Sequence, residues 1–203
     1  LTTGGYADRR DMTKPIGAIV LAAGFSKRFG DSKLLAQLHS GNTVVQQTLE
    51  RIAEVFPHRI VVTRPELIPQ LLPLAPGTSF LAFEHAEQGM GATLAFAAQH
   101  IGDWRACLVC LGDMPFIEAS TYRQIAEQIE EDSIVIPVLD SKIGNPVAFG
   151  SAYFDELGKL QGDAGGRKLI TLHRSAVREL SVDDPGVLQD IDTPQELARY
   201  QDS

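Results

Sequence analysis

Short, nearly uninterrupted apolar runs alternate along this chain with longer segments whose apolar residues recur at helical spacing. Residues 16–22 (IGAIVLA) and 59–63 (RIVVT) have the composition of buried strands. Between these runs, apolar residues recur every three or four positions, which is the stripe of an amphipathic helix: Val45, Leu49, Ile52 and Phe56. The order strand, helix, strand predicts two parallel strands joined by a helical crossover.

The same alternation continues towards the C-terminus. Helices are expected over about 91–100, 120–131 and 165–174 and from residue 194, and strands over 106–111, 133–138, 146–149 and 177–182. The last helix has the sequence of a capping box, with Thr193 as the cap and Glu196 as its partner. We therefore predict an α/β fold with three layers (α/β/α), Rossmann-like, in which helices cover both faces of a mainly parallel sheet.

The chain of 203 residues contains no internal repeat, low-complexity tract or Pro/Ser-rich linker. One domain over residues 15–203 is therefore expected. Residues 1–14 have no hydrophobic periodicity and include Gly4 and Gly5, so we expect a disordered leader there.

Composition excludes several classes of partner. The 18 Lys and Arg residues against 26 Asp and Glu residues give a net charge of −8, which disfavours nucleic acid and anionic membrane surfaces. No apolar run approaches the length of about 18 residues that a membrane span requires, and the first residues lack the apolar core of a signal peptide. We expect a cytoplasmic protein with no nucleic-acid or membrane partner.

The two cysteines are spaced as a C-x-x-C pair, which also occurs in redox and metal sites. Cys107 and Cys110 lie within a predicted buried strand, where residues three apart point to opposite faces. We expect two inert core thiols.

A small and basic loop follows the first strand, at the edge where open α/β sheets bind ligands. Ala22, Ala23 and Gly24 allow a ligand to approach the backbone closely, and Lys27, Arg28 and Lys33 place three cations nearby. The spacing matches neither a P-loop nor the G-x-G-x-x-G fingerprint. The loop is either an anion site or an ordinary strand-to-helix connection with solvated basic side chains.

Two acidic segments offer candidate metal ligands, and the first is expected at the same edge of the sheet as the basic loop. Asp113 follows the strand 106–111, and one or two carboxylates together with phosphate oxygens and water are the ligands that Mg²⁺ prefers. Asp190 and Asp192 precede the last helix, where a carboxylate also interacts favourably with the helix dipole. Asp113 is the leading candidate for a metal ligand, Asp192 the second, and Asp163 an alternative; a turn aspartate before a proline is the plain reading of Asp113.

Residues 21–33 resemble the signature of the nucleotidyltransferases related to the molybdenum-cofactor cytidylyl- and guanylyltransferases. The pattern is Leu-Ala-Ala-Gly-x-Ser-x-Arg-Phe-Gly-x-x-Lys, and the chain matches its small, basic and glycine positions. The resemblance extends over about residues 16–197 and implies the fold of the nucleotide-diphospho-sugar transferases. It also implies that the backbone of Leu21, Ala22, Ala23 and Gly24 holds the nucleobase and ribose, and that Arg28 and Lys33 hold the triphosphate.

Other segments are similar to the same family. Gly-Asp-Met-Pro at 112–115 and Asp-Ile-Asp-Thr-Pro at 190–194 imply metal ligands at Asp113 and Asp192, and Gln88–Thr93 implies nucleotide contacts at Gly89 and Thr93. Segments 144–149 and 162–168 resemble the cytidylyl branch and imply an acceptor pocket whose residues are Asn145, Asp163, Arg167 and Lys168. Cytidylyl members have Ala where guanylyl members have Gly at the position of Ala23, which implies CTP as the nucleotide.

The resemblance thus implies transfer of CMP from CTP to the terminal phosphate of a molybdopterin-type cofactor, with Mg²⁺ or Mn²⁺ and catalytic roles for Lys33, Arg28 and Asp113. The partners would be CTP, that cofactor, and a recipient molybdoenzyme or its chaperone. Alternatives are a guanylyl- or sugar-1-phosphate nucleotidyltransferase, and a non-catalytic carrier or insertion chaperone of the cofactor. A terpenoid-precursor cytidylyltransferase ranks lower, because such enzymes carry His-Asp-x-x-Arg where this chain has Gly112, Asp113 and Met114.

Overall fold

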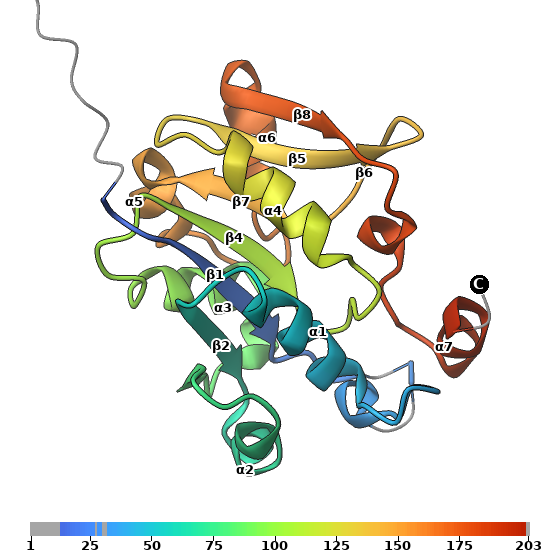
Figure 1. Cartoon of the computed structure of the whole chain (residues 1–203). Helices are drawn as coiled ribbons and strands as arrows, with labels where there is room; N and C mark the ends of the chain where they lie inside the picture. The colour runs from blue at the N-terminus through green and yellow to red at the C-terminus, as the bar shows by residue number, and fades with distance from the viewer. Residues whose placement is uncertain (1–12, 27, 30–31, 202–203) are drawn as a thin grey trace, which may run out of the picture.

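A twisted sheet runs through the computed structural model, which describes residues 13–26, 28–29 and 32–201 (Figure 1). Its strand order is β3-β2-β1-β4-β7-β5-β6, with β8 paired to β5. The strands are β1 (Ile16–Ala22), β2 (Arg59–Thr63), β3 (Ser79–Ala82), β4 (Ala106–Leu111), β5 (Ile134–Leu139), β6 (Lys142–Ile143), β7 (Val147–Gly150) and β8 (Val177–Ser181). The helices are α1 (Val44–Ala53), α2 (Ile68–Leu71), α3 (Met90–Ala98), α4 (Ala119–Gln128), α5 (Phe154–Leu157), α6 (Arg167–Leu172) and α7 (Pro194–Gln201).

Neighbouring strands are parallel from β3 through β2 and β1 to β4, and β8 is parallel to β5. Strand β7 is antiparallel to both β4 and β5. The connection from β5 to β7 holds only the short β6 hairpin, which leaves no room for the helical crossover that a parallel pair needs. The prediction of a mainly parallel sheet is confirmed, with β7 as the antiparallel insertion.

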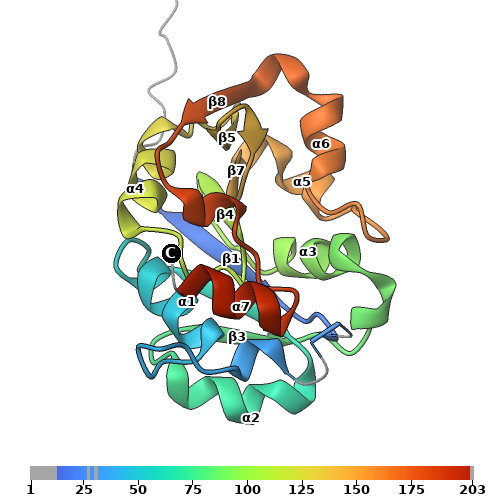
Figure 2. The ribbon, with the colours of Figure 1, turned by 90° about the vertical axis from the view of Figure 1, so that its right-hand side faces the viewer.

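Helices cover both faces of the sheet, as predicted. One face carries α1 and α4, which pack with Val20, Leu108 and Cys110 in one buried cluster. The other carries α3, α5 and α6, which pack with Ile19 and Cys107 in a second. Figure 2 shows α1 and α4 on one side of the strands and α3, α5 and α6 on the other.

The predicted cysteine environment is also confirmed. Cys107 and Cys110 are free thiols buried on opposite faces of β4, and burial raises the pKa of each thiol above its ordinary value. Neither is a reactive thiolate at neutral pH.

The predicted bounds of β1, β2 and β4 are those of the structure. The helix expected over 165–174 is shorter in the structure, where α6 spans Arg167–Leu172. Strand β3 and helix α2 were not predicted; β3 is a short edge strand, and α2 is a single turn flanked by 3-10 turns. Residues 1–12 of the predicted leader lie outside the described residues, whose helices include none long and apolar enough to cross a membrane.

Candidate active site

Loops from the carboxyl ends of β1 and β4 meet a third segment, residues 190–193, at one edge of the sheet. Strands β1 and β4 are parallel in register from Ile16–Ala106 to Leu21–Leu111, so the residues that follow them leave the sheet together. A cleft of about 530 Å³ opens there. The predicted site residues that line it are Leu21, Ala22, Ala23, Gly24, Lys33, Gly89, Thr93, Asp113, Asp163, Asp190 and Asp192.

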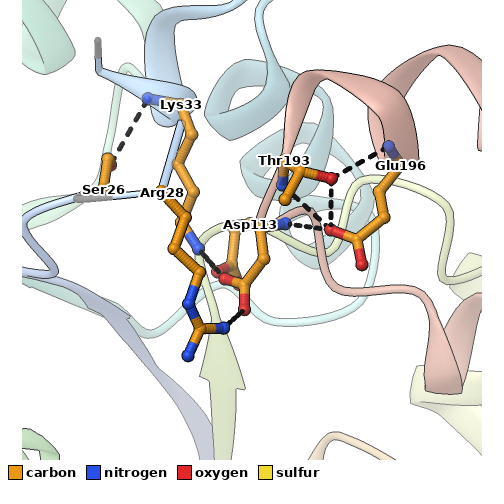
Figure 3. Close-up of polar contacts among 7 residues, drawn as sticks. Ser26, Arg28, Lys33, Asp113, Thr193 and Glu196 are labelled. Carbon is orange, nitrogen blue, oxygen red and sulfur yellow. Dashed lines mark hydrogen bonds and ion pairs between the residues drawn. The ribbon is translucent and has the colours of Figure 1, made fainter. Parts of the chain in front are cut away.

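Lys33 joins the two predicted metal ligands. Its Nζ lies 2.6 Å from Oδ2 of Asp113 and 2.8 Å from Oδ1 of Asp192. The Nη1 atom of Arg28 donates to Oδ2 of Asp192 at 2.9 Å, so Arg28 and Lys33 reach the same carboxylate. Figure 3 shows the side chains of Lys33 and Arg28 side by side at this point. The Lys33 and Asp113 side chains are only 12% and 16% exposed, whereas Arg28 is 77% exposed, so Lys33 is the inner cation and Arg28 the outer one.

These contacts keep Lys33 and Asp192 charged although both are partly buried. Burial by itself would lower the pKa of Lys33, but the nearby carboxylates of Asp113 and Asp192 outweigh it and raise the pKa above the usual 10.5. The hydrogen bond from Lys33 lowers the pKa of Asp192 below 3.8. At neutral pH, Lys33 is therefore a cation bonded to an ionised Asp192.

The predicted capping box positions Asp192. Glu196 Oε2 accepts the backbone N–H groups of Asp192 and Thr193, each at 2.9 Å, and the Glu196 N–H donates to Thr193 Oγ1 at 3.2 Å. The buried Ile191 donates its N–H to the carbonyl oxygen of Asp113 at 3.1 Å and packs with Leu197 of α7. The start of α7 is therefore fixed to the tip of β4.

The carboxylates of this cleft suit a hard divalent cation. Oδ1 of Asp113 is buried and has no hydrogen-bond partner among the described residues, so it keeps a free lone pair beside the cleft. Burial and the charge of Asp113 raise the pKa of the neighbouring Asp190. Residues 13–26, 28–29 and 32–201 contain no group of three or more His, Cys, Asp or Glu side chains placed to hold a metal. A cation here would need phosphate and water oxygens as well, which is how Mg²⁺ binds in nucleotide enzymes.

Gly89 and Gly91, at the start of α3, also make contacts within the protein, and the nucleotide contacts of Gly89 and Thr93 stay a prediction. The Gly91 N–H donates to the Gly162 carbonyl at 2.6 Å, and the Thr93 hydroxyl donates to the Gly89 carbonyl at 3.0 Å. Gly89 has a φ of 97°, and a Cβ there would overlap Asp163. The glycines thus seat the 161–163 turn against α3 and bring Asp163 to the cleft.

Three of the predicted acceptor residues do not line this cleft: Asn145, Arg167 and Lys168. Asn145 is half-buried, and its N–H donates to the Val187 carbonyl at 2.9 Å. Arg167 is exposed at the start of α6, and Lys168 follows it. Their acceptor role stays a prediction, and Lys27 lies outside the described residues.

Sequence reasoning missed the part of the wall formed by Phe25, Glu87 and Met90. One signal for Phe25 was present in the sequence. This aromatic residue lies in a loop of small and polar residues and belongs to no helical or strand pattern of apolar residues that would bury it. Phe25 is 44% exposed.

A family model described as a MobA-like NTP transferase domain matches residues 18–178. The chain belongs to this family. This MobA-like chain therefore contains a nucleotidyltransferase domain, and the predicted resemblance and fold are confirmed.

The MobA-like chain is similar to Rv0371c of Mycobacterium tuberculosis H37Rv, with 30% identity, a TM-score of 0.84, and coverage of 94% of this chain and 98% of that one. Another structure of Rv0371c, described as a complex with manganese, has 28% identity and a TM-score of 0.79 and covers 94% of this chain and 99% of that one. The molybdopterin-guanine dinucleotide biosynthesis protein A of Archaeoglobus fulgidus shares the fold, at 23% identity and a TM-score of 0.65, over 92% of this chain and 97% of that one.

Among curated relatives, the bifunctional protein GlmU of Sphingopyxis alaskensis is 29% identical over 71% of this chain. The chain spans about a third (33%) of the length of this GlmU protein.

We predict that Lys33→Met lowers the free energy of unfolding by about 2 kcal/mol, because it leaves the buried Asp113 carboxylate without its cation. Adding Asp113→Asn should restore most of the loss, since the uncompensated charge is then gone. Urea titrations of the two variants and the wild type measure both effects.

The matched control is Lys159→Met, which removes an exposed lysine and should change stability by less than about 0.5 kcal/mol. Equal stability of Lys33→Met and wild type, or no recovery in the double variant, would show that the ion pair does not hold the site together.

Proposed function

We propose that this protein is a magnesium-dependent cytidylyltransferase that transfers CMP from CTP to the terminal phosphate of a molybdopterin-type cofactor and releases pyrophosphate. The observation that carries the proposal is the contact of Lys33 with Asp113 on the wall of one cleft, beside the backbone of 21–24. A cation from one loop and a carboxylate from another are the two charges that a nucleoside triphosphate and a divalent ion require at one place. Residues 15–203 form the catalytic domain in this proposal.

The chemical problem is repulsion between two polyanions. The attacking phosphate oxygen is already anionic at neutral pH, so the chain need not supply a general base. Lys33 and Arg28 would neutralise the triphosphate and the departing pyrophosphate, while the backbone of 21–24 orients the nucleoside for in-line attack at the α-phosphorus. Leu21 and Ala23 are buried, so the protein interior supports this part of the wall.

Asp113 and Asp192 would hold Mg²⁺, or Mn²⁺ in its place, and the ion would supply further positive charge to the phosphates. Lys33 contacts both carboxylates with two of its three N–H donors, so one donor is left for a phosphate oxygen. Arg28 is the more exposed cation, and it would exchange its exposed contact with Asp192 for the outer phosphates.

CTP is favoured over GTP by Ala23. Its side chain is 6% exposed and lines the cleft, so its methyl group takes space that a larger purine needs. The molybdopterin acceptor rests on the family resemblance and on the printed name of the Archaeoglobus fulgidus protein, which shares the fold. Asp163 lies in the cleft where an acceptor would approach, and Asn145 and Arg167 would contact it from outside the cleft lining. A recipient molybdoenzyme or its chaperone would then take the product.

Pyrophosphate release from CTP with Mg²⁺, assayed with and without molybdopterin cofactor, tests the activity. We predict that Asp113→Asn lowers turnover at least a hundredfold, because losing a charge-stabilising group at the reacting phosphates costs about 3 kcal/mol or more of barrier. Its free energy of unfolding should fall by much less than this barrier rises, because Lys33 keeps its contact with Asp192.

The control is Asp183→Asn, which neutralises an exposed carboxylate outside the cleft and should keep full turnover. Nucleotide and cofactor binding without any pyrophosphate release would identify a carrier instead of a transferase. Full turnover by Asp113→Asn would remove this residue from the mechanism.

We further predict that Ala23→Gly raises kcat/KM for GTP relative to CTP by about tenfold, because one methyl group in a packed pocket contributes discrimination of this order. Parallel pyrophosphate assays with the two nucleotides give the ratio. An unchanged ratio would mean that base choice lies elsewhere, and a wild type that prefers GTP or a sugar-1-phosphate would replace the cytidylyl assignment.

A further inference from the structure

Phe25 is a large aromatic side chain left exposed on the wall of the cleft. It is 44% exposed, lines the cleft, and belongs to none of the three buried clusters. It directly follows Gly24, the last residue of the segment proposed to hold the nucleobase and ribose. An exposed aromatic ring is not stabilised by burial in the core, so its position on the cleft wall needs an explanation.

One face of the Phe25 ring is covered by Arg64. The guanidinium carbon of Arg64 lies 4.6 Å from the ring centroid, which is the geometry of a cation–π contact. Because this cation covers one face, the exposed area of the ring belongs to its edge and its opposite face.

Strand pairing brings the two residues together. Ala22 at the end of β1 pairs with Thr63 at the end of β2, and the Thr63 hydroxyl donates to the Ala22 carbonyl at 2.8 Å in a buried contact. Arg64 is the next residue, and Pro65 after it begins a 3-10 turn. The guanidinium is thus delivered by the rigid sheet edge to a ring in the first loop.

Arg64 itself is only partly satisfied. Its side chain is 20% exposed, and Nη1 contacts Glu66 Oε1 at 2.7 Å. Its Nε is buried and has no hydrogen-bond partner within the described part of the chain.

We propose that Phe25, backed by Arg64, is a stacking platform for the nucleobase of the donor nucleoside triphosphate. The inference rests on the proposed function and deepens it by assigning the base contact to a side chain. Every base offers a flat π face, so stacking on Phe25 supplies affinity and orientation without selecting the base. Selection by size is left to Ala23, which is buried in the adjoining wall.

A second candidate for the group that stacks on Phe25 is the pterin of the acceptor, which is also a flat heterocycle. Donor and acceptor are separated by measuring nucleotide binding with no acceptor present. The contribution of the phosphates is separated with inorganic tripolyphosphate, which carries the charge of the nucleotide and no ring.

The experiment is isothermal titration of the full chain, with Mg²⁺ present, using CTP, GTP and tripolyphosphate. Phe25→Ala should raise Kd for CTP and GTP alike by about tenfold and leave Kd for tripolyphosphate unchanged. Phe25→Tyr should remain within about twofold of wild type because it keeps the ring. Arg64→Met should weaken both nucleotides about threefold, since the ring loses its backing but remains.

Leu72→Ala is the matched control, because it removes another exposed apolar side chain, 55% exposed and outside the cleft lining, and should change none of the three constants. Unchanged nucleotide binding by Phe25→Ala would overturn the platform, as would an equal loss for tripolyphosphate, which would indicate a disordered loop. If wild type binds CTP but transfers no CMP, the proposed function fails, and the Phe25→Ala titration still tests whether Phe25 stacks on the nucleobase. If wild type binds no nucleotide, both fail.

Discussion

The arrangement of this site depends on one nearly buried cation, Lys33. An ammonium group that is withdrawn from water needs anionic partners, and here they come from two segments far apart in the chain, Asp113 and Asp192. Satisfying Lys33 therefore draws together the first loop, the tip of β4 and the start of α7. The capping box of α7 and the backbone contact between residues 113 and 191 hold the carboxylates in place for it.

The contacts of Lys33 with the two carboxylates also affect how a metal ion and a nucleotide bind. Lys33 is paired with both carboxylates, so a divalent cation and the lysine compete for the same two negative charges. A triphosphate resolves the competition, because its oxygens can take over the lysine while the metal takes the carboxylates. Metal and nucleotide should therefore favour each other's binding, and the coupling must be equal in both directions. An acidic cleft in an acidic protein can bind a polyanion in this way.

Much of this could be predicted from the sequence, because the signals are local. Continuous apolar runs predicted β1, β2 and β4 with correct bounds, and parallel pairing placed Lys33 and Asp113 at one sheet edge. The capping-box sequence predicted the start of α7. What the sequence did not reveal depends on tertiary contact: the triad of Lys33 with two carboxylates, the role of Gly91 in seating the 161–163 turn, and the pairing of Phe25 with Arg64. Strand β3 and helix α2 were missed because a four-residue edge strand and a four-residue helix carry too few residues to show a period.

Joint entry of metal and nucleotide at the carboxylates that contact Lys33 can be measured with Mn²⁺. Free Mn²⁺ can be quantified by electron paramagnetic resonance while the protein is titrated with and without CTP. We predict weak binding of Mn²⁺ alone and binding at least about tenfold tighter when CTP is present, with the same gain for CTP when Mn²⁺ is present. Equal affinity for Mn²⁺ with and without CTP, or no binding in either case, would contradict it.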